Sequence, residues 1–270
     1  MISDSVKIGK NVVIKDGVII GENVVLEDDV YLDYGCIIRD NVHVKKGSFI
    51  GAKCIIGEYL SDFYTNRVNG KNNLVIGEKA IIRSENVIYG NTNIGDNFQS
   101  GHKVIIRENT NIGSNVRIGT LSDIQHKCNI GNYVSIHSNC FVGEETVIKD
   151  YVWLFPKVTI TNDPTPPSNE LLGVTIEKFA VISAKSLILP GVHIEENSLV
   201  GGASVVTKNV PKETLVIGSP AKVIRSIGDI KNKVTGENAY PWRDKFTKGM
   251  PWEELGYDLW NENNKESREV

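Results

Sequence analysis

The chain has 270 residues, with 30 Lys and Arg against 33 Asp and Glu and a net charge of −3, which gives no electrostatic basis for binding nucleic acid or an anionic membrane. No apolar run is long enough to span a bilayer, and the first residues lack the basic-then-apolar pattern of a secretory signal. We therefore expect a cytoplasmic protein with no nucleic-acid and no membrane partner.

An aliphatic side chain recurs at every sixth position along most of the chain, and we call these positions anchors. One series runs from Ile8 to Ile56, a second from Ile76 to Ile160, and a third from Ile182 to Val206. Ser100 is the only non-aliphatic anchor of the second series. A period of six fits neither an amphipathic helix nor an alternating strand, so it indicates a repeat architecture.

The fourth position after most anchors is small or β-branched, and turn-forming residues lie between the two. Each hexad is therefore predicted to be a short strand plus a corner, and three hexads to close one triangular coil. Stacked coils would pair strand on strand about 4.8 Å apart. The sequence thus predicts an all-β parallel β-helix of about ten coils, spanning residues 1–218.

The four cysteines, Cys36, Cys54, Cys128 and Cys140, all occupy the fourth position after an anchor. A cysteine there is expected to act as a small buried hydrophobe. Cys36 and Cys54 are three hexads apart, close enough in stacked coils for a bridge, but the missing secretory signal favours free thiols.

Two segments interrupt the period. Residues 58–73 leave the pattern and return with the phase shifted, and residues 163–175 contain three prolines, which cannot pair in a central strand. Both are predicted to be loops extruded from a coil, and extruded loops can form the wall of a pocket on an otherwise smooth prism. The second loop opens from the polar sequence Thr161-Asn162-Asp163.

Residues 219–270 form a tail of different character. The segment SPAKVIRSI is predicted to be a short helix, with Ser219 as the N-cap and Pro220 at the first helical position. Three of the four tryptophans follow, so we expect the tail to dock on another part of the molecule.

Positions three hexads apart stack on one face, and this places the polar residues Glu108, His126, Glu144 and Asn162 in one column beside Asp163. His137 belongs to another face, between Gly119 and Phe155. Together they are the most concentrated set of acid–base groups in the chain. His102 follows the Ser100 anchor and marks either a distorted coil or a ligand contact.

The period of six resembles that of the hexapeptide-repeat acyltransferases, whose fold is a left-handed parallel β-helix. The segments GGASVVTKNVP (201–211) and IGSPAKVIR (217–225) are similar to the coenzyme A end of these enzymes. The resemblance implies acetyl-CoA as co-substrate and no metal. It implies a pantetheine path along Ala184, Gly201 and Gly202, and phosphate contacts from Lys208, Lys222 and Arg225.

A narrower resemblance rests on the motifs Ile124-Gln125-His126, Ile136-His137-Ser138, Val142-Gly143-Glu144, Thr161-Asn162-Asp163 and Tyr240-Pro241-Trp242-Arg243. It is to the N-acetyltransferases of nucleotide-linked amino sugars, in particular those that acetylate the 3-amino group of a dTDP-linked 3-amino-3,6-dideoxyhexose in glycan biosynthesis. It implies homotrimers with active sites between subunits. Arg83, Tyr64 and His102 are the residues we expect to contact the nucleotide sugar.

Acyl transfer from a thioester requires a neutral amine and a donor to the tetrahedral oxyanion. We expect Asp163 to orient the amine, Asn162 to shape the same wall, and His137 to accept the proton, since imidazole titrates near working pH. His126 and Glu144 would position the sugar or tune that histidine. Alternatively no protein base exists, and the proton passes to the departing sulfur.

Other functions stay open on the sequence. In one alternative, the protein is an acetyltransferase whose acceptor is a UDP-linked amino sugar or a sugar hydroxyl. In a second, the chain is a zinc-dependent hydratase using His102, His126 and His137, although these share no column. In a third it is a non-catalytic β-helix scaffold, which would leave the proline-rich loop and the coenzyme A motif unexplained.

Overall fold

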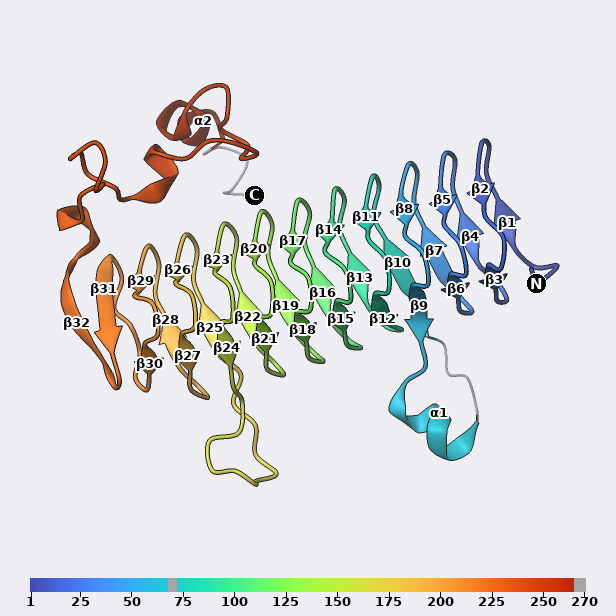
Figure 1. The fold of residues 1–270 in the computed structure, drawn as a ribbon, viewed down its shortest axis with the longest axis horizontal. Coiled ribbons are helices and arrows are strands. Elements are labelled where there is room, and N and C mark those ends of the chain that lie inside the picture. Colours follow the sequence, from blue (N-terminus) through green and yellow to red (C-terminus); the bar gives the residue numbers. More distant parts are fainter. Residues whose placement is uncertain (68–71, 265–270) are drawn as a thin grey trace.

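The computed structural model describes residues 1–67 and 72–264 and shows a three-sided parallel β-helix, as predicted (Figure 1). Sheet 1 contains β1 (Lys7–Ile8), β4 (Val25–Leu26), β7 (Val42–Val44), β10 (Leu74–Ile76), β13 (Asn93–Ile94), β16 (Asn111–Ile112), β19 (Asn129–Ile130), β22 (Val147–Ile148), β25 (Thr175–Ile176) and β28 (His193–Ile194). Sheet 2 contains β2 (Val13–Ile14), β5 (Tyr31–Leu32), β8 (Phe49–Ile50), β11 (Ile81–Ile82), β14 (Gln99–Ser100), β17 (Arg117–Ile118), β20 (Ser135–Ile136), β23 (Trp153–Leu154), β26 (Val181–Ile182), β29 (Leu199–Val200), β31 (Thr214–Gly218) and β32 (Ala221–Ser226). Sheet 3 contains β3 (Ile19–Ile20), β6 (Ile37–Ile38), β9 (Ile55–Glu58), β12 (Val87–Tyr89), β15 (Ile105–Ile106), β18 (Asp123–Ile124), β21 (Phe141–Val142), β24 (Thr159–Ile160), β27 (Leu187–Ile188) and β30 (Val205–Val206).

The anchors and the fourth positions after them fill the interior of the prism. Strands of successive coils pair in parallel at three-hexad spacing, as Ile118 does with Ile136. Almost every anchor from Ile20 onward is buried, and the four cysteines are buried and unbonded, which confirms the free thiols. Burial raises the pKa of the Cys54 thiol to about 12, so it stays protonated and behaves as an apolar side chain.

Ser100, the exceptional anchor, is buried in the same coil as Phe98, whose ring is also fully buried. The bulky ring takes the position that is small in most other coils, so a small anchor keeps the interior volume nearly constant. Strand β14 still pairs in register with β17. The interruption at Ser100 therefore reflects packing rather than a distorted coil.

Most corners turn through a residue of positive φ at the third position after the anchor, such as Asn23, Asn115 and Asn139. Asn adopts this left-handed conformation more readily than other non-glycine residues. Three successive corners between sheets 1 and 2 place aromatic residues there instead, namely Tyr133 at φ 55°, Tyr151 at φ 62° and Phe179 at φ 63°. Such bulky residues are rare in this conformation, and here they support the tail described below.

The two predicted loops both leave the prism at the corner between sheets 3 and 1 (Figure 1). The first follows β9 and carries helix α1 (Ser61–Asn66); residues 68–71 of this loop lie outside the described residues. The second follows β24 and continues without helix or strand until β25. Since β9 and β24 belong to the same sheet, the loops flank one stretch of a single corner.

The predicted helix in SPAKVIRSI is wrong, because residues 221–226 form β32, which pairs antiparallel with β31. Ser219 and Pro220 occupy the turn between the two strands. A helix would have left the outer edge of β31 unpaired, whereas the hairpin satisfies its backbone groups. The local helix signals were overridden by this pairing.

After the hairpin the chain folds back along the corner between sheets 1 and 2, away from the two loops (Figure 1). It contains the 3₁₀ turns Ile227–Asp229 and Trp242–Asp244 and helix α2 (Tyr257–Asn263). Trp252 is fully buried against Tyr151 and Phe179, with ring centroids 5.1 and 6.2 Å away. The predicted docking of the aromatic tail is thereby confirmed.

Candidate functional site

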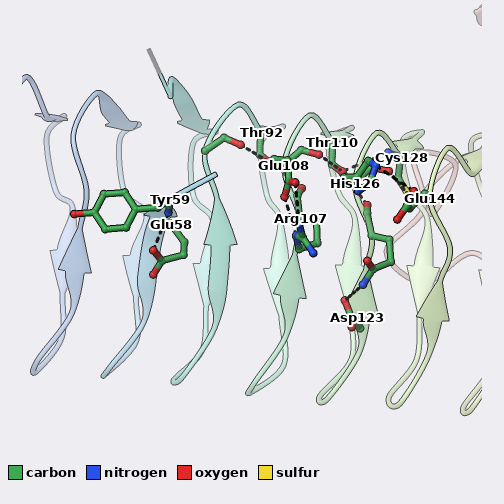
Figure 2. A network of polar contacts seen from close by, with 12 residues as sticks. Glu58, Tyr59, Thr92, Arg107, Glu108, Thr110, Asp123, His126, Cys128 and Glu144 are labelled. Carbon is green, nitrogen blue, oxygen red and sulfur yellow. Dashed lines mark hydrogen bonds and ion pairs between the residues drawn. The ribbon is translucent and has the colours of Figure 1, made fainter. Parts of the chain in front are cut away.

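The corner between sheets 3 and 1, which we call corner 3–1, carries the predicted polar column between the two loops. His126 Nε2 lies 3.1 Å from Glu144 Oε2 in the next coil. One coil further back, Arg107 donates to both carboxylate oxygens of Glu108, at 2.7 and 2.9 Å. Figure 2 shows these side chains following one another along adjacent coils. The structure therefore brings Glu108, His126 and Glu144 together as the three-hexad spacing predicts.

The charges of this column are internally compensated. Burial is the largest single influence and opposes ionisation of Glu108, but the hydrogen bonds and charge of Arg107, a backbone hydrogen bond and the charge of His126 together outweigh it, and the pKa of Glu108 is lowered. Arg107 also lies over the ring of Tyr89, 4.8 Å from its centroid. Burial raises the pKa of Asp123, which accepts a hydrogen bond from Gln125 at 2.8 Å. Neither Arg107 nor Asp123 was predicted from the sequence as a site residue, although Arg107 is next to Glu108 and Asp123 is three residues before His126.

Asp163 organises the start of the proline-rich loop at the same corner. Its carboxylate accepts hydrogen bonds from Ser168 Oγ at 2.8 Å, from the Ser168 amide at 2.9 Å and from the Thr165 amide at 3.0 Å. These donors, the Ser168 hydroxyl first, lower the pKa of Asp163. The carbonyl of Asn162 accepts from the Leu172 amide at 2.7 Å, which closes the loop. Asp163 is thus a fixed, ionised acceptor at the end of the column.

His137 lies on a different corner, between sheets 2 and 3, which we call corner 2–3. Its ring stacks on Phe155 with centroids 4.8 Å apart and lies 6.1 Å from the ring of Trp153. His137 Nε2 and Trp153 Nε1 are buried and have no hydrogen-bond partner among the described residues. Burial lowers the pKa of His137, which favours the neutral imidazole.

A cavity of about 420 Å³ extends from His137 toward the N-terminal coils along corner 2–3 and the outer face of sheet 2. Gly101 and Gly119 line it, and a Cβ at either would clash with the backbone of the next coil, so both positions require glycine. The cavity is lined by Arg83, Gln99, Ser100, Gly101, Arg117, Ile118, Gly119, Thr120, Ser135, Ile136, His137, Ser138 and Trp153. Its lining therefore combines polar and apolar groups in similar measure and includes His137.

Two arginines face this cavity. Arg83 donates to the carbonyl of Ser100 at 2.6 Å, and neither Arg83 nor Arg117 forms an ion pair with a carboxylate among the described residues. Arginines without an acidic partner on a concave surface are suited to an anion such as a diphosphate. Arg117 was missed from the sequence. The three-hexad spacing could have identified it, because Arg117 lies one coil from Gln99 and one coil from Ser135 on the outer face of sheet 2.

The residues expected to hold coenzyme A lie in two groups. Ala184, Gly201 and Gly202 continue corner 2–3 beyond Phe155, and a Cβ on Gly202 would meet only the Ala184 carbonyl oxygen, at 3.4 Å. The outer surface over Gly202 is therefore open. Lys208 follows β30 at corner 3–1, and Lys222 and Arg225 are exposed on β32.

The predicted site is consequently divided within one chain. One part belongs to corner 3–1 and consists of His126, Glu144, Asn162, Asp163 and the exposed Tyr64 of the first loop. The other part belongs to corner 2–3 and consists of His137, Arg83 and the exposed His102. Sheet 3 separates the two corners.

The outer face of sheet 3 differs in composition from that of sheet 1. Asp123 and Thr159 are polar, and the other eight outward residues of its ten strands are apolar, namely Ile19, Ile37, Ile55, Val87, Ile105, Phe141, Leu187 and Val205. Ile105 and Phe141, which lie on either side of Asp123, are 38% and 36% exposed, so apolar side chains of this sheet face solvent in the single chain. The corresponding part of sheet 1 carries a ladder of Asn93, Asn111 and Asn129. An apolar face of this kind is typical of a protein–protein interface.

Family models match two parts of the chain. The GMPPB C-terminal domain matches residues 1–95, and the bacterial transferase hexapeptide (six repeats) matches residues 101–144. Each match covers less than half of the chain, which folds as a parallel β-helix in both matched segments.

Curated relatives are acetyltransferases. The galactoside O-acetyltransferase of Escherichia coli K12 is 36% identical over 90 residues, covering 30% of this chain and 44% of that protein. The galactoside O-acetyltransferase of Lactococcus lactis is 34% identical over 100 residues, covering 34% and 45%. The chain thus spans less than half the length of these relatives. Over these 90 to 100 residues the chain is similar to two galactoside O-acetyltransferases.

Solved structures give partial superpositions. A hexapeptide-repeat acetyltransferase of Vibrio cholerae in complex with acetyl-CoA aligns at TM-score 0.35 and 26% identity, over 42% of this chain and 70% of that one. A mutant perosamine N-acetyltransferase of Caulobacter crescentus, with CoA and GDP-perosamine, aligns at TM-score 0.24 and 20% identity, over 52% and 57%.

Neither a membrane-spanning helix nor a metal cluster is found in the described part of the chain. In residues 1–67 and 72–264, no helix is long and apolar enough to cross a membrane. Within the same ranges, no group of three or more His, Cys, Asp or Glu side chains is placed to hold a metal ion.

Proposed function

We propose that the protein is an acetyl-CoA-dependent N-acetyltransferase that acetylates the 3-amino group of a dTDP-linked 3-amino-3,6-dideoxyhexose. The observation that carries this proposal is the order of groups along corner 2–3. Arg83 and Arg117 lie on the N-terminal side of the cavity, His137 lies at its other end, and the open surface over Gly202 follows beyond Phe155. An anionic nucleotide and a thioester can approach His137 from opposite directions along one edge.

The length of the cavity supports a nucleotide sugar as the acceptor. From β11, which precedes Arg83, to β23, which contains Trp153, the sheet order runs through four coil steps. At about 4.8 Å per step this corresponds to roughly 19 Å. That is enough for a sugar, a diphosphate and part of a nucleoside in extended form. The two arginines would bind the diphosphate, and the amine would lie beside His137.

The divided site supports a trimer. If three copies pack their apolar sheet 3 faces around a three-fold axis, the surface there is removed from water, and burial of apolar area is the main driving force for such association. Sheet 3 lies between the two corners, so corner 3–1 of one subunit would then face corner 2–3 of the next. Each site would combine His137 of one chain with Asp163, Glu144 and His126 of its neighbour.

The chemistry follows from these positions. The neutral amine attacks the thioester carbonyl, the C–S bond breaks, and coenzyme A leaves as a thiolate, to which the amine proton is delivered through His137. His137, held neutral by its apolar surroundings with a lowered pKa, accepts the amine proton. Asp163 is an ionised acceptor that can orient the amine, and the His126–Glu144 pair can fix the sugar hydroxyls.

A second candidate is O-acetylation of a sugar hydroxyl, which is favoured by the relation to galactoside O-acetyltransferases. The same groups would serve, with His137 activating a hydroxyl instead of an amine. Arg83 and Arg117, which have no acidic partner in the described part of the chain, favour a nucleotide-linked acceptor over a free sugar.

The test is release of coenzyme A thiol from acetyl-CoA with a panel of acceptors. We expect turnover with dTDP-linked 3-amino sugars, and at least tenfold lower kcat/KM with the UDP-linked amino sugars and with free galactosides. Absence of thiol release with every amino sugar would refute the proposal. Preference for a free galactoside would favour the O-acetyltransferase.

A further inference from the structure

The aromatic tail leaves an apolar slot of about 220 Å³ against the outer face of sheet 2. The slot is lined by Trp153, Phe155, Val181, Tyr240, Trp242 and Phe246. Three of these residues come from the β-helix and three from the tail. Neither the repeat pattern nor the proposed acetylation requires such a space.

The slot adjoins the cavity that contains His137. Trp153 lines both spaces, and Phe155, which lines the slot, stacks on His137 at 4.8 Å. Further along corner 2–3 lies the open surface over Gly202, proposed as the pantetheine path. A thioester carbonyl placed at His137 therefore has the slot directly beside it.

The lining of the slot suits a hydrocarbon chain. Five of its six residues are aromatic, and Val181 is 7% exposed. An apolar cavity of about 150 Å³ is enough to bind benzene, so this slot exceeds what the methyl group of an acetyl would fill. Trp153 Nε1 has no acceptor among the described residues, and a thioester carbonyl brings an oxygen that can accept from it.

The tail side of the slot is held in place by the rest of the tail. Trp242 Nε1 donates to the carbonyl of Phe179 at 2.9 Å, and its ring lies 6.0 Å from that of the buried Trp252. The ring of Trp153 meets Trp242 and Phe246 edge to face, at 5.9 and 5.4 Å. The slot is therefore preformed in the single chain.

We infer that this slot binds the acyl chain of the thioester donor, so that acyl groups of three or four carbons are transferred as well as acetyl. The inference rests on the proposed acyl transfer and extends it to the donor. The reaction is otherwise unchanged: the C–N bond forms, the C–S bond breaks, and the amine proton ends on the thiol of coenzyme A or on His137. Each added methylene that enters the slot is expected to tighten binding about fourfold.

The experiment compares acetyl-CoA, propanoyl-CoA and butanoyl-CoA, by calorimetric binding and by thiol release with one amino-sugar acceptor. Wild-type protein should bind butanoyl-CoA, which has two more methylenes, about 15-fold more tightly than acetyl-CoA. Val181→Phe fills the slot and should remove this difference while leaving acetyl-CoA within threefold of wild type. Val13→Phe, at an outward valine of β2 in the same sheet, is the matched control.

A second variant is needed because Val181→Phe could displace the tail from the β-helix instead of only filling the slot. Phe246→Ala widens the slot at a partly exposed position, and it should shift the preferred donor from four carbons toward six. If wild-type protein turns over acetyl-CoA but neither binds nor uses the longer donors, the slot is not an acyl site and the inference fails alone. If no donor of any length supports turnover, the proposed function fails instead.

Discussion

For single residues, the environment of His137 decides its chemistry. The ring is stacked on Phe155 next to Trp153, and its Nε2 has no partner among the described residues. Little in this setting stabilises an imidazolium, so the neutral form is favoured and can accept a proton. By contrast His126 lies 3.1 Å from Glu144, so that ring has an acidic partner. The histidines of sheet 1 likewise have acidic partners, with His43 at 2.6 Å from Glu27 and His193 at 3.2 Å from Glu177.

One prediction concerns the titration of the His137 ring. Because burial lowers the pKa of His137, the ring should titrate below the ordinary value of about 6.5 in an NMR titration. The unfolded chain then binds this proton more readily than the folded one, so His137 destabilises the fold as pH falls below that value. A midpoint at or above about 6.5 would contradict the burial argument.

Substitution separates the two chemical alternatives. His137→Asn should lower kcat by about 10² or more if the ring is the base. A fall of less than tenfold would mean that the amine proton passes to the departing sulfur instead. The His43→Asn variant on β7, remote from corner 2–3, is the control and should retain wild-type rates.

Among the elements, the tail is an independent layer docked on the prism. Its buried centre is Trp252, which packs on aromatic corner residues, and the tail forms one wall of the slot beside His137. Without the Trp252 side chain the tail should detach from the prism. The hydrogen-bonded coils should stay folded, since each coil contacts mainly its neighbouring coils.

A substitution at the buried tryptophan tests the docking of the tail. Trp252→Ala should cost about 3–5 kcal/mol of tail docking. Amide exchange in residues 240–263 should then become fast, while exchange in the β-helix stays slow. Leu259→Ala, at a position of α2 that is 48% exposed, is the matched control and should leave protection unchanged. Unchanged protection in Trp252→Ala would show that other contacts hold the tail.

For the whole molecule, an apolar face separates two incomplete sets of polar groups. Sheet 3 presents Ile105 and Phe141 to solvent, with the His126–Glu144 column on one side and His137 on the other. A three-fold arrangement around sheet 3 would cover the apolar face and complete the site by the same contact.

A charge placed on this face tests the arrangement. Phe141→Lys should convert a trimer into smaller species by light scattering, because a charge in a buried apolar interface is costly. Asn129→Lys, on the exposed face of sheet 1, should remain trimeric. A trimer that persists with full activity in Phe141→Lys would place the interface elsewhere.

Mixed trimers give a sharper readout of the shared site. His137→Asn and Glu144→Gln chains, each strongly impaired alone, should regain about one quarter of wild-type activity after being unfolded and refolded together, because one interface in four then has both residues intact. If both residues acted within one chain, no activity would return.

The β-helix, its two loops and the column of Glu108, His126 and Glu144 could all be predicted from the sequence. These features depend on spacing alone: a period of six sets the coil, and three hexads bring side chains into line. The same reasoning placed His137 on a separate face, next to Phe155. The face of the prism on which each of these polar side chains lies was therefore predictable from its position in the repeat.

The remaining features required the folded structure. The segment predicted as a helix became β32 because the edge of β31 was available for pairing, which no local signal encodes. Arg117 and Trp153 joined His137 because outward strand residues meet a corner of the same prism, and the slot exists because a tail far along the chain folds back over Val181. Periodicity fixes what repeats, whereas contacts between non-repeating segments depend on shapes that form only when the whole chain has folded.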